Sequence, residues 1–417
     1  MTEELPALTA EQTAERLGIK LETLYAYVAR GRLSRIRTAA GSTFDPLEVE
    51  RFAANRRQRS AAAPSAARAH SDGRPLMVIE TGFAHIEDGD LYYRDREAVE
   101  LARNSSFETV AHWALTGVSD AEARFTVARP AVVPAGHVAD AMPAAATHRD
   151  RQQVAVTALA AADPLRYSLE TDVVVSAVEA LVAGMVEVLP LVGGASPVGE
   201  GAVGGDDDAS IAERLWTRLT DRPVTTEGVR ELDAALVLLI DHDIAISTLA
   251  ARAAASARAN PYAVVTAGLG ALDSPLHGNA SRAAHRMLAR VLAGEHPERV
   301  IADTMVSGRG TVPGFGQVLY RGADPRGVGL LGMLREHPEA ADVVEAVERV
   351  AAIVGSRTGT HPNVDLALAA VALANGMIED AGEVIFATAR TVGWIVHALD
   401  EYSRRPLRLR PVGRYVG

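Results

Sequence analysis

The sequence of 417 residues contains no cysteine, a single lysine (Lys20) and no long apolar run. The absence of cysteine excludes disulfide bridges, thiol nucleophiles, iron–sulfur clusters and zinc sites that use cysteine. The longest apolar run, from Leu366 to Ala374, is too short to span a bilayer, and the acidic N-terminus lacks the apolar core of a secretory signal. We therefore predict a soluble cytoplasmic protein without a membrane partner.

Charge is distributed unevenly along the chain. The formal net charge is −11, yet residues 1–75 hold 12 basic and 9 acidic side chains, whereas the remainder holds 30 basic and 44 acidic ones. A chain of this length has room for two or three domains at roughly 100–200 residues each. The charge pattern predicts a weakly basic head and an acidic body with different partners.

The head, residues 1–57, has the pattern of three short helices. Thr9 and Gln12 fit a capping box at the start of the first helix, which Gly18 ends. Apolar residues recur at helical spacing in the second helix, and the segment AAGSTFD could form a short β-hairpin. A third helix is expected to begin at Pro46, with Asp45 as its cap. The residues expected on the apolar faces of the second and third helices are Leu21, Leu24, Tyr25, Val28, Leu47, Val49 and Phe52.

Over about 50 residues this pattern resembles the excisionase or MerR-like winged helix-turn-helix family. The resemblance implies that helix 21–30 enters a major groove of DNA. It also implies that nearby arginines contact phosphates: Arg30, Arg32, Arg35 and Arg37. Because the net charge of +3 predicts weak binding by one copy, dimerisation would be needed. The alternative is a small helical module that contacts another protein.

Two segments have the composition of flexible loops. Residues 58–75 are rich in alanine, serine and arginine without a periodic apolar face, which predicts a linker. Residues 199–210 read as an acidic glycine and aspartate loop.

The body shows apolar residues at helical spacing nearly everywhere and little strand-like alternation, so its predicted fold class is mostly α. The clearest stretches are Val154 to Ala162, Val173 to Leu189, Leu232 to Ile240, Ala280 to Leu292 and Val343 to Val354.

Polar and charged residues interrupt these helices in four loops that also contain glycine, proline or further polar residues, where chemistry is best sought. They are IDHD with His242, PLHG with His277, GFGQVLYRGADPR with Gln317, Arg321, Asp324 and Arg326, and PNVD with Asp365. Each alone has a structural interpretation, such as a core histidine, a helix-start carboxylate or a surface arginine. Their order and spacing together favour function.

PLHG, GFG followed by DPR, and PNVD, in that order, resemble the citrate synthase family, from about residue 78 to the end. The resemblance implies a homodimer of helical subunits with an active site between two domains. The large domain would comprise residues 76–276 and 372–417, and the small domain residues 277–371.

The family condenses an acyl-CoA, usually acetyl-CoA, with oxaloacetate. By resemblance, Asp365 is the base that removes the thioester α-proton, and His277 hydrogen-bonds the thioester oxygen. The chemistry is consistent, because a weakly acidic proton requires a carboxylate made more basic by burial and a donor aimed at the developing oxyanion. The product would be citrate, or 2-methylcitrate from propionyl-CoA, and no metal or bound cofactor is implied beyond the CoA thioester.

Substrate-binding residues follow from the same resemblance. Arginine suits a dicarboxylate because its fork of donors matches each carboxylate. The oxaloacetate set would be His242, Arg326, Arg390 and Arg410, the last reaching across the dimer interface. The CoA set would be Arg321, Arg357, Gly314 and Gly316.

The sequence departs from the family pattern at Gln317, where a histidine normally polarises the oxaloacetate carbonyl. An amide can donate a hydrogen bond but cannot become cationic, so we expect reduced activity. Asp243 and Ala245 also stand where a glutamate and an asparagine are common. Two alternatives therefore stay open: a DNA-binding regulator whose body senses a dicarboxylate or CoA ligand with little turnover, and an ordinary enzyme whose head makes partner contacts.

Overall fold

The computed structural model describes residues 5–38, 41–61, 78–192, 208–274, 277–307, 311–317, 319–320 and 322–415. Most of them are helical, in agreement with the predicted class. The strands are β1 (Leu8–Thr9), β2 (Ile36–Thr38), β3 (Gly41–Phe44), β4 (Ala84–Glu87), β5 (Asp90–Tyr93) and β6 (Arg96–Glu97). The helices are α1 (Ala10–Leu17), α2 (Leu21–Ala29), α3 (Pro46–Ala61), α4 (Ala98–Asn104), α5 (Phe107–Thr116), α6 (Arg129–Asp140), α7 (His148–Ala162), α8 (Thr171–Glu187), α9 (Ile211–Leu219), α10 (Thr226–Leu239), α11 (Ile246–Ser256), α12 (Pro261–Leu272), α13 (Ala280–Leu292), α14 (Pro297–Ser307), α15 (Pro325–Glu336), the 3-10 helix η2 (Pro338–Ala340), α16 (Ala341–Thr358), α17 (Val364–Ala374) and α18 (Ala381–Ser403).

The head contains α1, α2, α3 and an antiparallel sheet in the order β1-β3-β2. The predicted capping box is present. The backbone N–H of Gln12 donates to the Thr9 hydroxyl at 3.2 Å, and the backbone N–H of Thr9 donates to the side-chain oxygen of Gln12 at 2.9 Å. Gly18 ends α1 in the left-handed conformation, which glycine adopts without steric cost. The hairpin of β2 and β3 lies where the sequence predicted it.

Two expectations for the head need correction. Leu21 and Tyr25 are exposed, at 37% and 40%, so the predicted apolar face of α2 is covered only around Leu24 and Val28. Helix α3 continues to Ala61, so residues 58–61 belong to a helix rather than to a linker. The rest of the expected linker and most of the expected loop at 199–210 lie outside the described residues.

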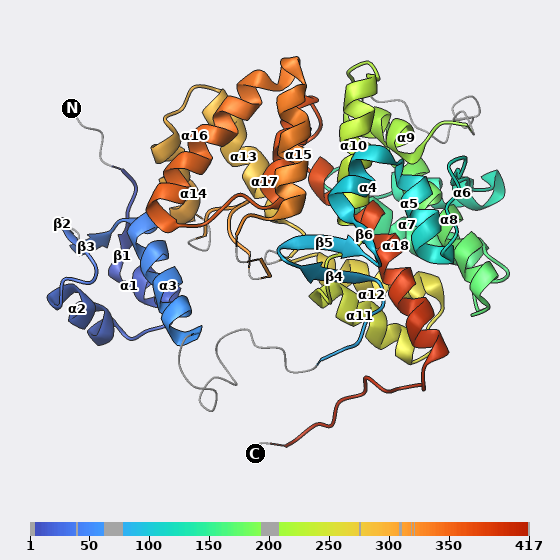
Figure 1. The fold of residues 1–417 in the computed structure, drawn as a ribbon, viewed down its shortest axis with the longest axis horizontal. Helices are drawn as coiled ribbons and strands as arrows, with labels where there is room; N and C mark the ends of the chain where they lie inside the picture. The colour runs from blue at the N-terminus through green and yellow to red at the C-terminus, as the bar shows by residue number, and fades with distance from the viewer. Residues whose placement is uncertain are drawn as a thin grey trace.

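The helices of the body form two groups (Figure 1). Helices α13 to α17 pack on one another and lie between the head and the remaining helices. The second group contains α4 to α12 and α18, together with the sheet in the order β4-β5-β6. This small sheet was not expected from the sequence. Its first turn uses Asp88 and Gly89, both with positive φ, which suits a tight hairpin.

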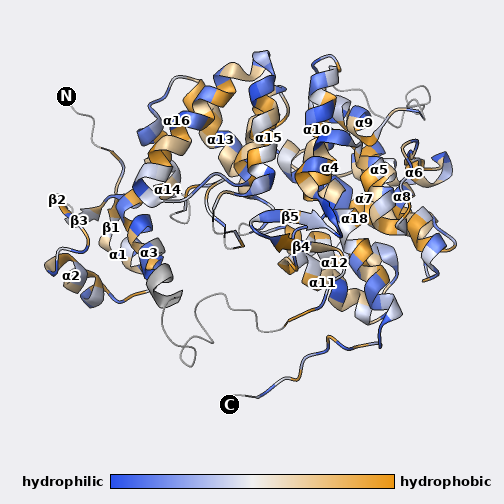
Figure 2. Cartoon of the chain, viewed as in Figure 1, coloured by the Kyte–Doolittle hydropathy of each residue, from blue (hydrophilic) through white to orange (hydrophobic). Residues whose placement is uncertain are grey.

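The centre of the body is built on α17 and α18, which are buried on nearly all sides. Leu366 to Ala372 are all buried, as a helix surrounded by other helices requires. Outer helices such as α16 carry hydrophobic and hydrophilic residues on the same helix (Figure 2). Among the described residues, no helix is long and apolar enough to cross a membrane.

Candidate functional site

Five of the predicted residues form one electrostatically connected group, which we call the site cluster: His242, His277, Arg326, Asp365 and Arg390. His242 follows α10, His277 precedes α13, Arg326 and Asp365 lie in the first turns of α15 and α17, and Arg390 lies within α18. The charge of Arg326 acts on the pKa of both histidines and of Asp365. The five side chains, which lie far apart in the sequence, are thus brought together by both groups of body helices.

Arg326 is held by its own helix start. Asp324 caps α15 by accepting the Arg326 backbone N–H at 3.1 Å, and it binds the guanidinium at 3.0 and 2.8 Å. The same carboxylate accepts the Val364 N–H at 3.2 Å, which joins α15 to the start of α17. Burial alone would lower the pKa of Arg326, but Asp324 raises it above its usual value. Arg326 is a fixed cation.

Arg390 lies at 1% exposure in the middle of α18. Its Nε donates to the carbonyl of Leu239 at 2.8 Å, and the guanidinium lies 4.7 Å from the ring centre of Phe386. Both terminal nitrogens are buried and lack a hydrogen-bond partner among the described residues. Burial lowers the pKa of Arg390 to about 10, so it remains cationic at neutral pH. A buried guanidinium with two free nitrogens is arranged to bind a carboxylate from a ligand.

Asp365 is presented by the N-terminus of α17. The side chain of Asn363 caps this helix by accepting the Asp365 N–H at 3.0 Å. Burial raises the pKa of Asp365 to about 6; the charge of Arg326 opposes this shift, and Asp324 adds to it. At neutral pH the carboxylate is ionised and more basic than a solvated one, which suits a general base.

His277 is oriented by a chain of hydrogen bonds. The indole N–H of Trp394 donates to the Ser247 hydroxyl at 3.3 Å, and that hydroxyl lies 2.7 Å from Nε2 of His277. An indole can only donate, so the simplest arrangement has the hydroxyl donating to Nε2 and leaves the proton on Nδ1. Burial, with Arg390 and Arg326, lowers the pKa of His277 to about 4. The ring is therefore a neutral donor at physiological pH.

Gln317 lies in the loop before α15, and its amide is engaged within that loop. Its oxygen accepts the N–H groups of Leu319 and Tyr320 at 2.5 and 2.7 Å, and its Nε2 donates to the Tyr320 carbonyl at 2.9 Å. A second, longer contact of 3.4 Å joins Nε2 to the Gly322 carbonyl. In this conformation the amide supports the loop and offers no free donor to a ligand.

The GFG loop packs against the segment before α17. Gly314 and Gly316 have φ of 80° and 74°, and a Cβ at Gly314 would lie 2.7 Å from Cβ of Leu366. The Asn363 N–H donates to the Gly314 carbonyl, and the Gly316 N–H donates to the His361 carbonyl, both at 2.9 Å. The structure therefore accounts for these glycines by backbone geometry. Their predicted role in CoA binding stays a prediction.

Two other predicted residues, Arg357 and Arg410, lie apart from the site cluster, and a third, Arg321, is outside the described residues. Arg357, at the end of α16, is paired with Asp45 at the start of α3, so it connects the body to the head. Arg410 is exposed on the C-terminal tail, which leaves the helices of its own chain (Figure 1).

The predicted DNA-contacting residues surround the turn after α2. Arg30, Arg32 and Arg37 are exposed, and Arg35 is partly buried. Among the described residues, none of the four is paired with a carboxylate.

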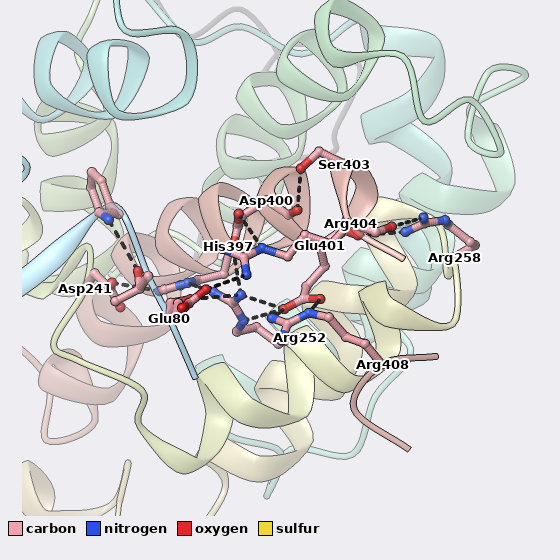
Figure 3. Close-up of polar contacts among 12 residues, drawn as sticks. Glu80, Asp241, Arg252, Arg258, His397, Asp400, Glu401, Ser403, Arg404 and Arg408 are labelled. Atoms are coloured by element: carbon pink, nitrogen blue, oxygen red, sulfur yellow. Dashed lines mark hydrogen bonds and ion pairs between the residues drawn. The ribbon is translucent and has the colours of Figure 1, made fainter. Parts of the chain in front are cut away.

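A buried polar network holds Asp241, the residue before His242 (Figure 3). Asp241 lies 2.8 Å from Nε2 of His397, whose Nδ1 lies 2.8 Å from Arg252. Because arginine only donates, His397 accepts at Nδ1 and donates from Nε2 to Asp241. Arg252 also binds Glu401 at 2.7 Å, and Glu401 accepts from Arg408 at 2.8 Å. The network thus links the residue beside His242 to the beginning of the C-terminal tail.

Sequence reasoning did not identify several of these supporting residues: Ser247, Tyr320, Asp241, His397 and Trp394. Asp324 was noted in DPR, where an aspartate before Pro-Arg signals a helix cap. The others are single polar or aromatic residues in apolar stretches, and no spacing rule reveals that they meet. Among the described residues, no group of three or more histidine, aspartate or glutamate side chains could hold a metal ion.

Known proteins similar to this chain are citrate synthases and a 2-methylcitrate synthase. The family profile of the citrate synthase C-terminal domain matches residues 72–412. Citrate synthase of Saccharolobus solfataricus is 29% identical over 215 residues, which cover 50% of this chain and 57% of that protein. Citrate synthase of Synechocystis is 26% identical over 362 residues, covering 82% and 89%. 2-Methylcitrate synthase 2 of Corynebacterium glutamicum is 29% identical over 223 residues, covering 51% and 57%. The first and third of these matches thus span little more than half of the relative.

Solved structures show the same fold. Citrate synthase of Pyrobaculum aerophilum has a TM-score of 0.66 at 21% identity, covering 92% of this chain and 95% of that one. Citrate synthase of Thermoplasma acidophilum, in a ternary complex with carboxymethyl coenzyme A and oxaloacetate, has a TM-score of 0.65 at 23% identity, covering 82% and 94%.

Proposed function

The chain belongs to the citrate synthase family, and we propose that it joins a short acyl-CoA to oxaloacetate. Acetyl-CoA would give citrate, and propionyl-CoA would give 2-methylcitrate. The observation that carries the proposal is Arg390, whose two buried terminal nitrogens have no partner among the described residues, beside the fixed cation Arg326. A buried cation without a partner, next to a second arginine, suits a dianion, because a ligand carboxylate can replace the hydration that burial removed from Arg390.

The remaining members of the site cluster suit the removal of a proton next to a thioester. Asp365 has its pKa raised to about 6 by burial, so it is ionised at neutral pH and more basic than a free aspartate. His277 is neutral, and its Nδ1 proton is available to the thioester oxygen as the enol forms. His242, whose pKa burial lowers well below 6.5, would contact oxaloacetate as a neutral ring. The enol carbon would then attack the ketone, and hydrolysis would release CoA.

The test is CoA release from acetyl-CoA or propionyl-CoA in the presence of oxaloacetate. Asp365→Asn should lower kcat by about 10²–10⁴-fold, the usual contribution of a general base. Asp342→Asn is the matched control, because Asp342 is an exposed aspartate in the first turn of α16. If wild type and the Asp365 variant release CoA at the same rate with both substrates, the proposal is wrong.

We propose further that the protein acts as a homodimer in which Arg410 serves the partner's site. The proposal is supported by the exposed position of Arg410 on a tail that leaves its own helices. Arg410→Ala and Asp365→Asn chains should each be weak alone and should recover activity when mixed, because one site of the mixed dimer then has both residues. If activity does not recover after the two variants have exchanged chains, Arg410 does not serve the active site of the partner subunit.

A second candidate function, DNA binding by residues 1–57 as a winged helix-turn-helix, is favoured by the exposed and unpaired arginines around residue 30. The full chain should bind duplex DNA with an affinity that falls as salt rises. Replacing Arg30, Arg32 and Arg37 with alanine should reduce both the affinity and the salt dependence. DNA binding that responds to oxaloacetate or CoA, without CoA release, would favour a regulator. Absence of binding at low salt would leave the head as a module for protein contacts.

A further inference from the structure

Condensation creates a negative charge on the former ketone oxygen, and this oxygen needs a proton. The cationic residues of the site cluster are arginines: the pKa of Arg326 is raised, and a carboxylate bound to Arg390 would hold that guanidinium in its protonated form. Burial lowers the pKa of both His242 and His277, so neither ring is the imidazolium that could protonate an alkoxide. Gln317, at the position where the family pattern has a histidine, is bonded to its own loop. The acid for this step must come from another side chain.

Tyr320 brings a phenol to the site cluster from the same loop that carries Gln317. Its side chain is 7% exposed, and its hydroxyl lies 2.8 Å from Nε2 of His242. The two rings lie 5.4 Å apart at an angle of 36°. The three hydrogen bonds between the Gln317 amide and residues 319–320 hold this turn, so the glutamine fixes the backbone that directs the phenol.

The pKa of the Tyr320 phenol is affected both by burial and by the charge of Arg326. Burial raises the pKa of Tyr320, and the positive charge of Arg326 opposes that effect. The phenol is therefore protonated at neutral pH and can act as a donor. Burial disfavours a localised alkoxide more than a phenolate, whose charge is spread over the ring, so proton transfer from Tyr320 to the alkoxide remains favourable despite the raised pKa.

We propose that Tyr320 is the proton donor to the ketone oxygen of oxaloacetate, with His242 as the hydrogen-bond partner of its hydroxyl. The inference rests on the proposed condensation. The enol carbon forms a bond to the ketone carbon, the π electrons of the carbonyl move to oxygen, and that oxygen takes the phenol proton. The phenolate then takes a proton from solvent. Asp365 releases to solvent the proton that it removed from the thioester, so the number of protons is conserved. Gln317 is a positioning residue for this donor.

The experiment compares Tyr320→Phe with wild type in two assays. The first measures CoA release with oxaloacetate. The second measures exchange of the acetyl-CoA methyl protons with D₂O in the presence of malate, a dicarboxylate with a hydroxyl in place of the ketone. Exchange requires Asp365 and His277 but no proton donor for a ketone. Tyr320→Phe should lower kcat for condensation by about 10²–10³-fold and leave the exchange rate within about twofold of wild type.

The matched control is Tyr262→Phe, which removes a buried phenol in the first turn of α12 whose hydroxyl binds Asp163 at 2.9 Å. It should behave as wild type in both assays. Condensation by Tyr320→Phe at the wild-type rate, or an equal loss of exchange and condensation, would overturn the role of Tyr320 while leaving the proposed function intact. Absence of both reactions in wild type would instead overturn the proposed function and this inference with it.

Discussion

Replacement of Arg390 by methionine should separate ligand binding from stability, because the terminal nitrogens of this buried cation have no partner among the described residues. The guanidinium is 1% exposed, and both terminal nitrogens lack a partner among the described residues. Burial lowers its pKa from the ordinary arginine value to about 10. A base with a lowered folded pKa destabilises the folded state at every pH below that value, and the cost disappears as pH rises above about 10 towards the ordinary pKa of arginine.

The magnitude follows from that shift. At 1.36 kcal/mol per pKa unit, burying the charge costs about 3 kcal/mol at neutral pH. Arg390→Met removes this cost and loses the hydrogen bond from Nε to the Leu239 carbonyl, which contributes about 1 kcal/mol. We therefore expect the ligand-free variant to be about 2 kcal/mol more stable than wild type. Oxaloacetate should stabilise wild type and have little effect on the variant, whose KM for oxaloacetate should rise at least tenfold.

The assay is chemical denaturation at pH 7 with and without oxaloacetate. Arg252→Met is the matched control, because Arg252 is also fully buried but is paired with Glu401 and Asp400. Removing it breaks the buried pair with Glu401, which keeps only Arg408, and takes the donor away from Nδ1 of His397, so it should cost about 3–5 kcal/mol. A ligand-free Arg390→Met protein that is less stable than wild type would refute the reasoning, since the guanidinium would then be satisfied without a ligand.

Three further predictions concern titration and the head. The value of kcat/KM should fall as pH drops through about 6, because Asp365 must be ionised to act as a base; a profile that is flat from pH 5 to 7 would contradict this role. Asp45→Asn should lower KM for acyl-CoA severalfold without changing KM for oxaloacetate, because it frees Arg357 for CoA phosphates; an unchanged KM would argue against CoA binding by Arg357. Burial raises the pKa of Asp233 to about 7, so its ionisation destabilises the folded state as pH rises from about 4 to 7. The free energy of unfolding of wild type should therefore fall between pH 5.5 and 7.5, and in Asp233→Asn this fall should be about 1–2 kcal/mol smaller. An equal fall in both proteins would show that Asp233 is not buried as a neutral acid.

Local sequence patterns predicted much of the secondary structure. The capping box of Thr9 and Gln12, the end of α1 at Gly18 and the start of α3 at Pro46 depend on interactions within a few residues, and all three are confirmed. Helix α13 spans Ala280–Leu292, the stretch in which periodicity predicted it. Burial was harder to predict, because the exposure of Leu21 and Tyr25 depends on which neighbours cover α2.

The sequence by itself determined the mostly helical class and the absence of any thiol chemistry, and it predicted the base and the arginine side chains of the proposed site. Those properties depend on composition, periodicity and short motifs. Only the tertiary structure decided how the side chains are used. Arg326 is paired with its own helix cap, whereas the terminal nitrogens of Arg390 have no partner among the described residues. Gln317 is bonded to its loop, whereas Tyr320 reaches His242. The physical reason is that pKa values and free donors depend on burial and on partners as far as 151 residues away, as in the bond from Arg390 to Leu239.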